Sequence, residues 1–172
     1  MTLEPVIIRP FADDDLVGTA AALVEVHHTD GYPVEGVEDP GAWIKSDVVL
    51  ASWVAESNGR IVGHVAVMKP QGEAAVNLWI KQSGDSEDRV GVLARLFVVQ
   101  PARKQAAGRR LMDSAVAYAR AHGLRLVLDV MTKDAAAIHL YERLGWRKIG
   151  ETLHPFGNGK TSPAVCYVAP TN

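Results

Sequence analysis

The feature that most limits the fold is one stretch in which an apolar run, a proline, a group of cations and a helical pattern follow each other directly. The run VGVLARLFVV at residues 90–99 is typical of a buried strand. In residues 107–123 apolar side chains recur at helical spacing, and Gly123 can end the helix. A strand that feeds a helix through a short turn favours a mixed α/β sandwich.

The junction between this strand and this helix has the composition of an anion site. The first turn of a helix leaves about four N–H groups without intrahelical partners, and the helix dipole adds positive potential there. Small residues let an anion approach the main chain, and cations add charge-assisted contacts. The small residues are Ala106, Ala107 and Gly108, and the cations are Arg103, Lys104 and Arg109. The arrangement suits a pyrophosphate, and a solvated basic helix start is the alternative. The P-loop and dinucleotide patterns do not fit, because no Gly-Lys-Ser/Thr follows and the junction has a single glycine.

Composition indicates one domain spanning residues 1–172. The chain is 48% hydrophobic and 22% charged, so it can bury a core. Its net charge of −2 argues against a dedicated nucleic-acid binder. The single cysteine, Cys166, excludes an internal disulfide. We expect a cytoplasmic protein with no membrane partner, because the N-terminal residues do not resemble a secretory peptide and no stretch reaches about 20 apolar residues.

Periodicity and turn signals predict the order β-α-α-β-β-β-α-β-α-β-β. Asn58-Gly59, between two β-rich runs, is a strong signal for a two-residue hairpin. The predicted strands are 6–10, 49–57, 60–69, 90–99, 124–130, 146–153 and 164–169, with 74–80 as an extension of the sheet. The predicted helices are 13–28, capped by Asp13 or Asp14, a short one near 40–46, then 107–123 and 134–145. The segments 29–41, 81–89 and 154–163 are expected to be loops.

Two blocks of the sequence resemble the GNAT superfamily of N-acetyltransferases. The pattern V-x-P-x-x-R-x-x-x-x-G-R-x-L, which begins at Val99, is similar to the coenzyme A motif of that family. The block LDVMTKDAAAIHLYERLGWRKIGE at 128–151 is similar to the family's Leu-Glu-Val…Asn…Ala-Ile-x-Leu-Tyr-x-x-Leu-Gly-Phe. Ala106, Asp129 and Asp134 stand where the family has glycine, glutamate and asparagine. The resemblance covers residues 91–151. Two blocks in the family's order are far more specific for the family than either block alone.

The resemblance implies a fold, an activity and a cofactor. The implied fold is α/β (α+β), a GNAT-type mixed, mostly antiparallel twisted sheet of six to seven strands with about four helices, splayed between the strands at 91–99 and 124–130. The implied reaction moves an acetyl group from acetyl-CoA to a primary amine by direct attack in a ternary complex. The acceptor is a small molecule or a peptide N-terminus, and a homodimer is one option. The implied cofactor-binding positions are Phe97, Val98, Val99, Arg103, Lys104, Gln105, Ala106, Ala107, Gly108, Arg109, Asp134, Ala137 and Tyr141.

Tyr141 and Asp129 are the catalytic candidates that the resemblance implies. A phenol can give a proton to a departing thiolate, and Tyr141 matches the tyrosine that does so in the family. Asp129 matches the carboxylate that accepts a proton from the amine in one branch of the family. The alternatives are a core position for Tyr141 and an exposed strand position for Asp129. Glu73 and Glu25 are further candidates for a base that acts through water.

The acceptor pocket is expected between the loop after the first helix and the loop between the last two strands. Its candidate residues are His28, Tyr32, Trp43, His154 and Phe156. No metal site is expected, and Cys166 is predicted to be packed, which favours direct transfer over an acyl-cysteine intermediate. A non-catalytic acyl-CoA-binding sensor or subunit is the alternative function, and a nucleic-acid patch ranks last because of the acidic balance.

Overall fold

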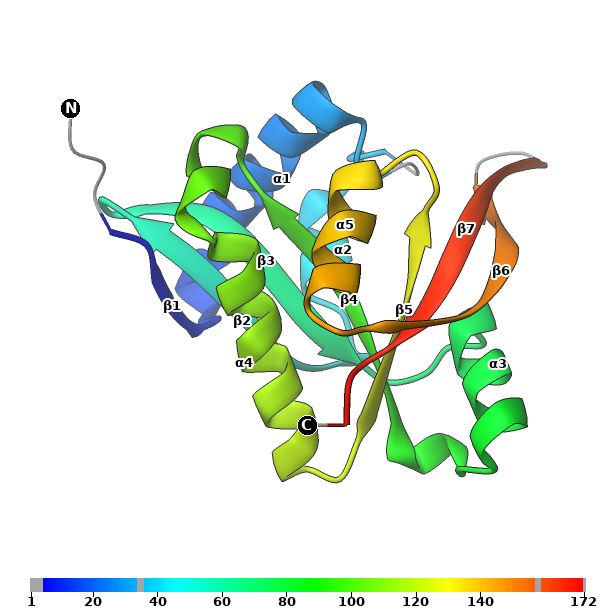
Figure 1. Ribbon diagram of the computed structural model, residues 1–172. Helices are drawn as coiled ribbons and strands as arrows, with labels where there is room; N and C mark the ends of the chain where they lie inside the picture. The colour runs from blue at the N-terminus through cyan, green and yellow to red at the C-terminus, as the bar shows by residue number, and fades with distance from the viewer. Residues whose placement is uncertain (1–4, 34–35, 157–158, 172) are drawn as a thin grey trace. The chain divides into compact units, whose positions relative to one another are not determined.

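The computed structural model, drawn in Figure 1, describes residues 5–33, 36–156 and 159–171. The chain divides into two compact units. The first unit consists of Met1–Met68 and Ala94–Ala115, and the second of Lys69–Leu93 and Val116–Asn172. Strand β4 (Val90–Val98) and helix α4 (Ala107–Ala121) each contribute residues to both units.

The first unit contains an antiparallel arrangement of β1 (Ile7–Pro10), β2 (Val49–Ser57) and β3 (Arg60–Met68). Asn58 and Gly59 join β2 to β3 with φ angles of 54° and 74°. A two-residue hairpin turn of type I′ requires positive φ at both central positions, and Asn-Gly satisfies this requirement at low cost. The predicted hairpin is therefore confirmed.

The helices of the first unit begin with α1 (Leu16–Asp30), which follows a 3-10 turn at Asp13–Asp15 (η1). The prediction that Asp13 or Asp14 caps this helix is wrong. Asp15 occupies the N-cap position, and its carboxylate accepts hydrogen bonds from the Ala12 amide at 2.8 Å and from Arg9. The acidic run therefore forms a separate turn before the helix starts.

Two further helical segments of the first unit agree with the sequence. The short helix predicted near 40–46 is α2 (Pro40–Ile44), whose first turn is capped by Asp39 through the Ala42 amide at 3.1 Å. After β4 the chain forms the 3-10 turn η3 (Gln100–Gln105) and then enters α4.

In the second unit, β5 (Arg125–Met131), β7 (Lys160–Val168) and β6 (Arg147–Phe156) are joined by antiparallel ladders in that order. Strand β4 pairs with β5 in parallel over three residue pairs, the first of which joins Val90 to Arg125. The predicted loop at 154–163 is wrong, because both strands continue into it and His154 pairs with Ser162. The two strands of a hairpin stabilise each other through cross-strand pairs, so they extend beyond the apolar residues from which they were predicted.

The segment 74–80, predicted to extend the sheet, forms helix α3 (Ala74–Ser83) instead. Ala75, Val76 and Trp79 are its buried residues, and this spacing belongs to one face of a helix. Gly84, at φ 77°, ends the helix in the left-handed conformation. A short apolar run suits a strand or a helix equally well by composition, which explains the wrong prediction.

Helices α3 and α5 (Ala135–Arg143) cover opposite faces of the strands of the second unit. On one face, a Cβ placed on Gly150 would lie 2.7 Å from Leu78 Cδ1 of α3. Gly150 is in register with Cys166, so α3 covers the Cys166 side of the sheet. On the other face, the rings of Tyr141 of α5 and Tyr167 lie 6.2 Å apart. Because neighbouring strand residues point to opposite faces and Tyr167 follows Cys166, α5 covers the face opposite to α3.

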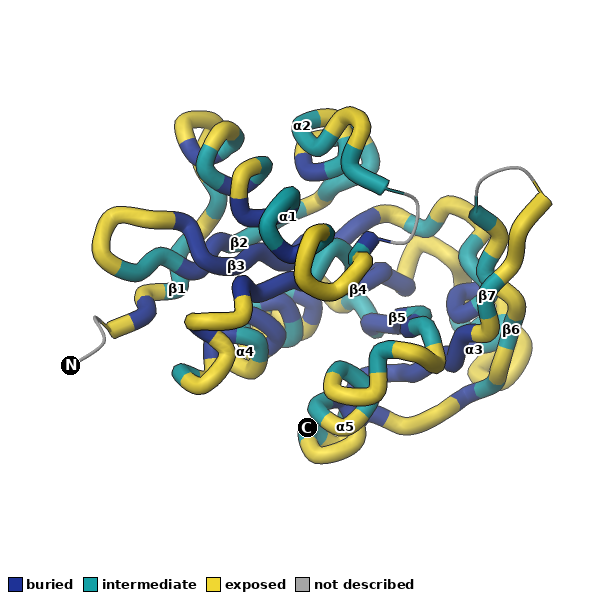
Figure 2. Tube along the Cα trace, turned by 90° about the horizontal axis from the view of Figure 1, so that it is seen from above, coloured by how far each residue is buried: buried dark blue, intermediate teal, exposed yellow. Residues whose placement is uncertain are grey.

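The strands hydrogen-bond in the order β1-β2-β3-β4-β5-β7-β6 and form a seven-stranded mixed sheet, which confirms the predicted fold class. Because α3 is a helix, the described residues contain five α-helices where about four were predicted. The buried residues lie mainly on the strands, while the helices carry buried and exposed residues in turn (Figure 2). Within the described ranges, no helix has the length and apolar character needed to cross a membrane.

Candidate active site

The junction after β4 presents main-chain donors at the start of α4. Ala106 adopts the left-handed conformation, with φ 59° and ψ 26°, at the end of η3. The Arg110 amide donates to the Ala106 carbonyl at 3.0 Å, so the N–H groups of residues 107–109 lie in the first turn of the helix. Ala107 is fully buried, while Gly108 is half-buried. This turn therefore has the donor geometry and the positive dipole end of an anion site.

The cations of the junction have different surroundings. Arg103 donates from Nε to the Val98 carbonyl at 2.9 Å and from Nη2 to Asp30 Oδ2 at 2.5 Å. Burial raises the pKa of Asp30, but hydrogen bonds, including one from Arg103, outweigh it and hold the pKa below its usual value. Lys104 and Arg109 are exposed. The guanidinium of Arg103 thus braces the end of β4 against α1, and Lys104 and Arg109 face solvent.

The residues at and just after the end of β4 that were predicted to contact the cofactor have buried side chains. Phe97, Val98 and Val99 are 4%, 8% and 0% exposed, so contacts to a bound molecule would come from their main chain. The Val99 amide donates to the Val62 carbonyl of β3 at 2.9 Å. Contacts made by the main chain of such a strand edge cannot be predicted from the side chains in the sequence.

Tyr141 is buried in the second unit. It is 6% exposed, and its ring lies 6.1 Å from that of Trp146. Burial raises the pKa of the phenol well above its ordinary value, and the charge of Asp134 adds to this effect. The phenol therefore stays protonated across the physiological range, as a proton donor must.

Asp134 lies at the N-cap of α5 without a side-chain capping hydrogen bond. Its carboxylate pairs with the neighbouring Lys133 at 3.1 Å, and its main-chain oxygen accepts from the Ile138 amide. Ala137, in the first turn of α5, is half-buried.

Asp129 sits on β5 in register with Cys166, on the face that α3 covers. Its Oδ1 is buried and has no hydrogen-bond partner among the described residues. Burial and, to a smaller extent, the charge of Glu73 raise the pKa of Asp129 to about 6, while His154 and the Ala75 amide oppose the shift. A carboxylate that titrates near neutral pH can accept a proton from an amine.

Cys166 is fully buried beside this carboxylate, as predicted from its strand position. Burial and the charge of Asp129 raise the pKa of the thiol to about 12. A thiol with this pKa supplies almost no thiolate at neutral pH, which argues against an acyl-cysteine intermediate.

Asp129 and Tyr141 lie on opposite sides of the strands of the second unit. Asp129 shares its face with Cys166, whereas Tyr141 packs on Tyr167, whose register partner on β5 is Leu128. The two catalytic candidates therefore do not contact each other through one face of these strands.

The residues predicted to line the acceptor pocket divide between the units. In the first unit, the Tyr32 and Trp43 rings lie 5.8 Å apart, and Trp43 lies 6.3 Å from Phe97. His28 is exposed on α1 and is not part of these ring contacts. In the second unit, His154 and Phe156 lie on β6 rather than in a loop, and the structure brings His154 into the electrostatic surroundings of Asp129.

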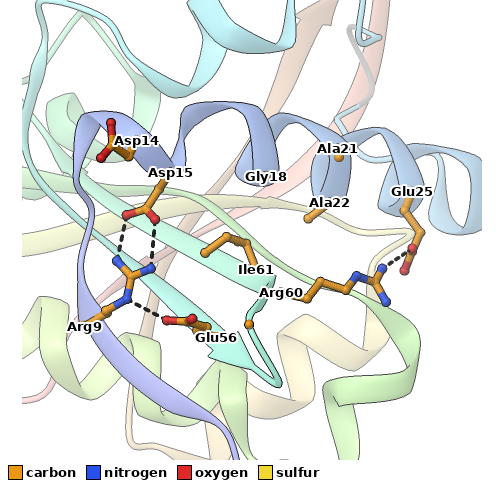
Figure 3. Close-up of a pocket in the computed structure, with 11 residues that line it drawn as sticks. Arg9, Asp14, Asp15, Gly18, Ala21, Ala22, Glu25, Glu56, Arg60 and Ile61 are labelled. Carbon is orange, nitrogen blue, oxygen red and sulfur yellow. Dashed lines mark hydrogen bonds and ion pairs between the residues drawn. The ribbon is translucent and has the colours of Figure 1, made fainter.

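A depression of about 400 Å³ in the first unit lies away from these residues (Figure 3). Most of its charged side chains pair with each other, with Arg9 between Asp15 at 2.7 Å and Glu56 at 2.8 Å. Glu25, an alternative base from the sequence, lines this depression and pairs with Arg60. Because none of the other predicted site residues lines it, we do not assign the reaction to this depression.

Two features of the site escaped sequence reasoning. The helical start at Glu73, which brings its charge to Asp129, was hidden because 74–80 looked like a strand. The contact of His64 with the Arg95 carbonyl is also absent from any sequence pattern, because it joins two strands.

Comparison with known proteins establishes the family. Residues 22–146 match the model of the Acetyltransferase (GNAT) family. The chain belongs to the GNAT acetyltransferase family. It is 33% identical over 117 residues to "Probable N-acetyltransferase camello" of Xenopus laevis, covering 67% of this chain and 47% of that protein. It is 28% identical over 116 residues to "N-acetyltransferase family 8 member 3" of Rattus norvegicus, covering 66% of this chain and 46% of that protein. The chain thus spans about half the length of the curated relatives that it matches.

A solved structure with the same fold is Arabidopsis thaliana NAA60 in complex with acetyl-CoA. It superposes with a TM-score of 0.71 at 20% identity, covering 95% of this chain and 97% of that one. At this identity the likeness supports the fold, and the family membership rests on the matched family model.

Proposed function

We propose that this protein is an N-acetyltransferase that moves an acetyl group from acetyl-CoA to a primary amine. The observation that carries the proposal is Asp129, whose buried Oδ1 has no partner in the described part of the chain. Leaving a carboxylate buried and unsatisfied costs stability, and such groups cluster at functional sites. In an acetyltransferase family, the role that this group fits is acceptance of the amine's proton.

The groups that would hold the cofactor are those of the junction after β4. Ala106 already adopts the left-handed conformation that turns the chain into α4, and the first-turn N–H groups face a solvent-accessible end. Such a turn matches a pyrophosphate, because it offers donors and positive potential without a buried charge. Lys104 and Arg109 are exposed and would add charge-assisted contacts, while Arg103 contributes by bracing β4. Gln105, Ala107, Gly108, Asp134 and Ala137 remain proposed contacts.

When bound, acetyl-CoA supplies the activated thioester. Asp129 takes the proton that the acceptor ammonium must lose before its nitrogen can attack. Tyr141 holds a proton at its phenol oxygen for the sulfur that leaves, and its raised pKa keeps that oxygen protonated at neutral pH. In the balance of the reaction, a C–N bond forms and a C–S bond breaks. The nitrogen loses two protons, the first to Asp129 and the second to the phenolate that Tyr141 leaves when it gives its own proton to the sulfur.

The acceptor is proposed to be a small molecule or a peptide N-terminus. A solved neighbour, NAA60 of Arabidopsis thaliana, has been crystallised with a bisubstrate analogue, with a TM-score of 0.71 and 20% identity to this chain. Tyr32, Trp43 and Phe156 offer apolar surface for such an acceptor, and His154 lies in the electrostatic surroundings of Asp129.

A thiol-release assay with acetyl-CoA and a panel of primary amines tests the proposal. Tyr141→Phe removes the proton donor and keeps the ring, so we expect turnover to fall by about one to three decades. Coenzyme A affinity, measured by calorimetry, should change little. Tyr118→Phe, the same chemical change on α4, is the matched control and should leave turnover near the wild-type value.

Wild-type turnover in Tyr141→Phe would remove this residue from the mechanism. Tight coenzyme A binding by the wild type with no turnover on any amine would instead favour a non-catalytic acyl-CoA-binding sensor. Ala106, Asp134 and the shortened Asp129, which depart from the family's pattern, are the features in favour of that second function.

Location and assembly remain predictions from the sequence. A cytoplasmic protein and a homodimer are expected, and sedimentation of the purified chain at micromolar concentration checks the second.

A further inference from the structure

Strand β4 leaves regular strand geometry at Arg95. Its φ is 57°, in the left-handed region that residues with a side chain rarely adopt. The two other described non-glycine residues with positive φ, Asn58 and Ala106, lie in a hairpin turn and at a helix start. Arg95 alone of these three lies inside a strand, so neighbouring groups must hold it there.

His64 of β3 makes the contact that holds this bend. Its Nδ1 lies 2.8 Å from the Arg95 carbonyl oxygen. A carbonyl can only accept a hydrogen bond, so Nδ1 carries the proton and Nε2 has a lone pair. Burial, together with the charge of Arg95, lowers the pKa of His64 to about 4. The ring therefore stays neutral, with the proton on Nδ1, throughout the physiological range.

The surroundings of His64 fix the orientation of its ring. The ring stacks on Phe97 at 5.4 Å between centroids and 23° between planes, and Phe11 meets it edge-on at 6.1 Å. His64 is 0% exposed, and its Nε2 has no hydrogen-bond partner within residues 5–33, 36–156 and 159–171. Burying a histidine ring with one nitrogen unsatisfied costs folding free energy, so a position that only filled space would favour an apolar ring.

The two residues before His64 also hold β4. Val62 accepts the hydrogen bond of the Val99 amide at 2.9 Å. A Cβ on Gly63 would lie 3.1 Å from the Phe97 carbonyl oxygen, so glycine permits a close approach of the two main chains. Residues 62–64 therefore lie against three alternate residues, 95 and 97 of β4 and 99 just after it. His64 supplies the side-chain contact of this set.

We propose that His64 is a positioning residue that fixes the bend at Arg95 and so aims the main-chain groups of residues 96–98. This inference rests on the proposed function, which places the cofactor along that strand edge. His64 does not touch substrate in this account; it acts through β4. If the bend relaxed, the N–H and carbonyl groups beyond it would rotate away from the direction that the cofactor requires.

Two amide substitutions separate positioning from packing. The amide nitrogen of asparagine corresponds in place to Nδ1 of histidine, and that of glutamine corresponds to Nε2. We expect His64→Asn to keep coenzyme A affinity within about threefold, and His64→Gln to weaken it by about tenfold, the usual weight of one buried hydrogen bond. His64→Phe keeps the ring and loses the donor, and it should behave as His64→Gln does.

Residual dipolar couplings of the amides of residues 96–98, recorded without any acceptor, report the orientation of the N–H bonds and are independent of the ring current that is lost with the imidazole. They should stay near the wild-type values in His64→Asn and change in His64→Gln and His64→Phe. These measurements do not depend on turnover, so they remain decisive even if no amine is acetylated and the proposed function fails. Equal losses in the two amide variants, or wild-type affinity and wild-type couplings in His64→Phe, would overturn the proposal.

The wild-type protein provides a test that needs no variant. Nitrogen-15 spectra of the imidazole should show the proton on Nδ1 from about pH 5 to pH 9. If the spectra showed the proton on Nε2, the contact with the Arg95 carbonyl would be lost and the proposal with it.

Discussion

The two units of this protein carry function in different chemical forms. In the first unit the candidate groups are main-chain donors, and the side chains of Phe97, Val99 and Ala107 are buried. In the second unit they are titratable side chains, Asp129 and Tyr141, whose pKa values are raised by burial. Holding an anion needs N–H groups and shape, whereas moving a proton needs a side chain that can gain or lose one.

The destabilising cost also differs between the units. The first contains conformational strain at Arg95 and Ala106, with φ angles of 57° and 59°. The second contains an electrostatic cost, because Asp129 is ionised at neutral pH in a site where burial and Glu73 disfavour the charge. We therefore expect that relieving the backbone strain in the first unit leaves the acetyl transfer intact, whereas removing the buried charge of Asp129 in the second unit abolishes it.

The largest effect is expected from Asp129→Asn in the second unit. Loss of the proton acceptor should lower kcat/KM by about two to four decades. The same change should raise the free energy of unfolding at pH 8 by about 1–3 kcal/mol, because the pKa of Asp129 is raised from 3.8 to about 6 on folding. The gain should shrink as pH falls through about 6 and vanish below 3.8, where the folded and unfolded states both hold the proton.

Asp113→Asn on the exposed side of α4 is the matched control, and it should change neither quantity appreciably. Urea unfolding at several pH values and initial rates on one amine provide the two measurements. A variant of Asp129 that lost stability but kept its activity would break the contrast between the units.

A smaller effect is expected from Glu73→Gln. The wild-type kcat/KM should rise with pH through a midpoint of about 6, where Asp129 ionises. Removing the nearby negative charge lowers the pKa of Asp129, so that midpoint should move to lower pH. It should stay above the ordinary aspartate value because burial is the larger cause of the shift.

Glu87→Gln removes the same charge from the exposed 3-10 turn before β4 and should leave the midpoint in place. If the Glu73 variant and this control had identical pH profiles, α3 would have no part in tuning the base.

The smallest effect is expected from Ala106→Gly in the first unit. Glycine adopts φ near 59° without the penalty that an alanine methyl brings, so the free energy of unfolding should rise by about 1 kcal/mol. Coenzyme A affinity should increase or stay the same, because removal of the methyl group opens the approach to the main chain. Turnover at saturating substrates should not change.

Ala117→Gly, in the exposed middle of α4, is the reference for this prediction, and it should destabilise by about 0.5–1 kcal/mol. Thermal unfolding of both variants gives the comparison. If both alanine variants lost stability, Ala106 would not be strained and the contrast between the units would weaken.

Sequence patterns succeeded where local chemistry decides structure. Asn58-Gly59 marked a hairpin because few residues other than glycine and asparagine tolerate that turn. The apolar stripe of α4 and its end near Gly123, at φ 69°, also followed from periodicity and backbone preference. The buried position of Cys166 followed from alternation along a terminal strand.

Sequence patterns failed where distant segments decide structure. Residues 74–80 became a helix because one side of that helix packs against Gly150, far along the chain. The ends of β6 and β7 extended beyond their apolar cores because each supplies the hydrogen-bond partners of the other. Neither the helix at residues 74–80 nor the ends of β6 and β7 can be predicted from nearby residues, because both depend on which surfaces meet in the fold.

By itself, the sequence determined the strand–turn–helix at residues 90–121, the hairpin at residues 58–59 and the motif blocks that identify the family, because these depend on neighbours within one or two helical turns. Only the tertiary structure decided that Asp129 is buried with an unsatisfied oxygen, that Arg103 braces β4 against Asp30, and that His64 holds Arg95. The reason is that burial and hydrogen-bond partners across the fold come from segments tens of residues apart, and these properties set the pKa of an acid and the bend of a strand.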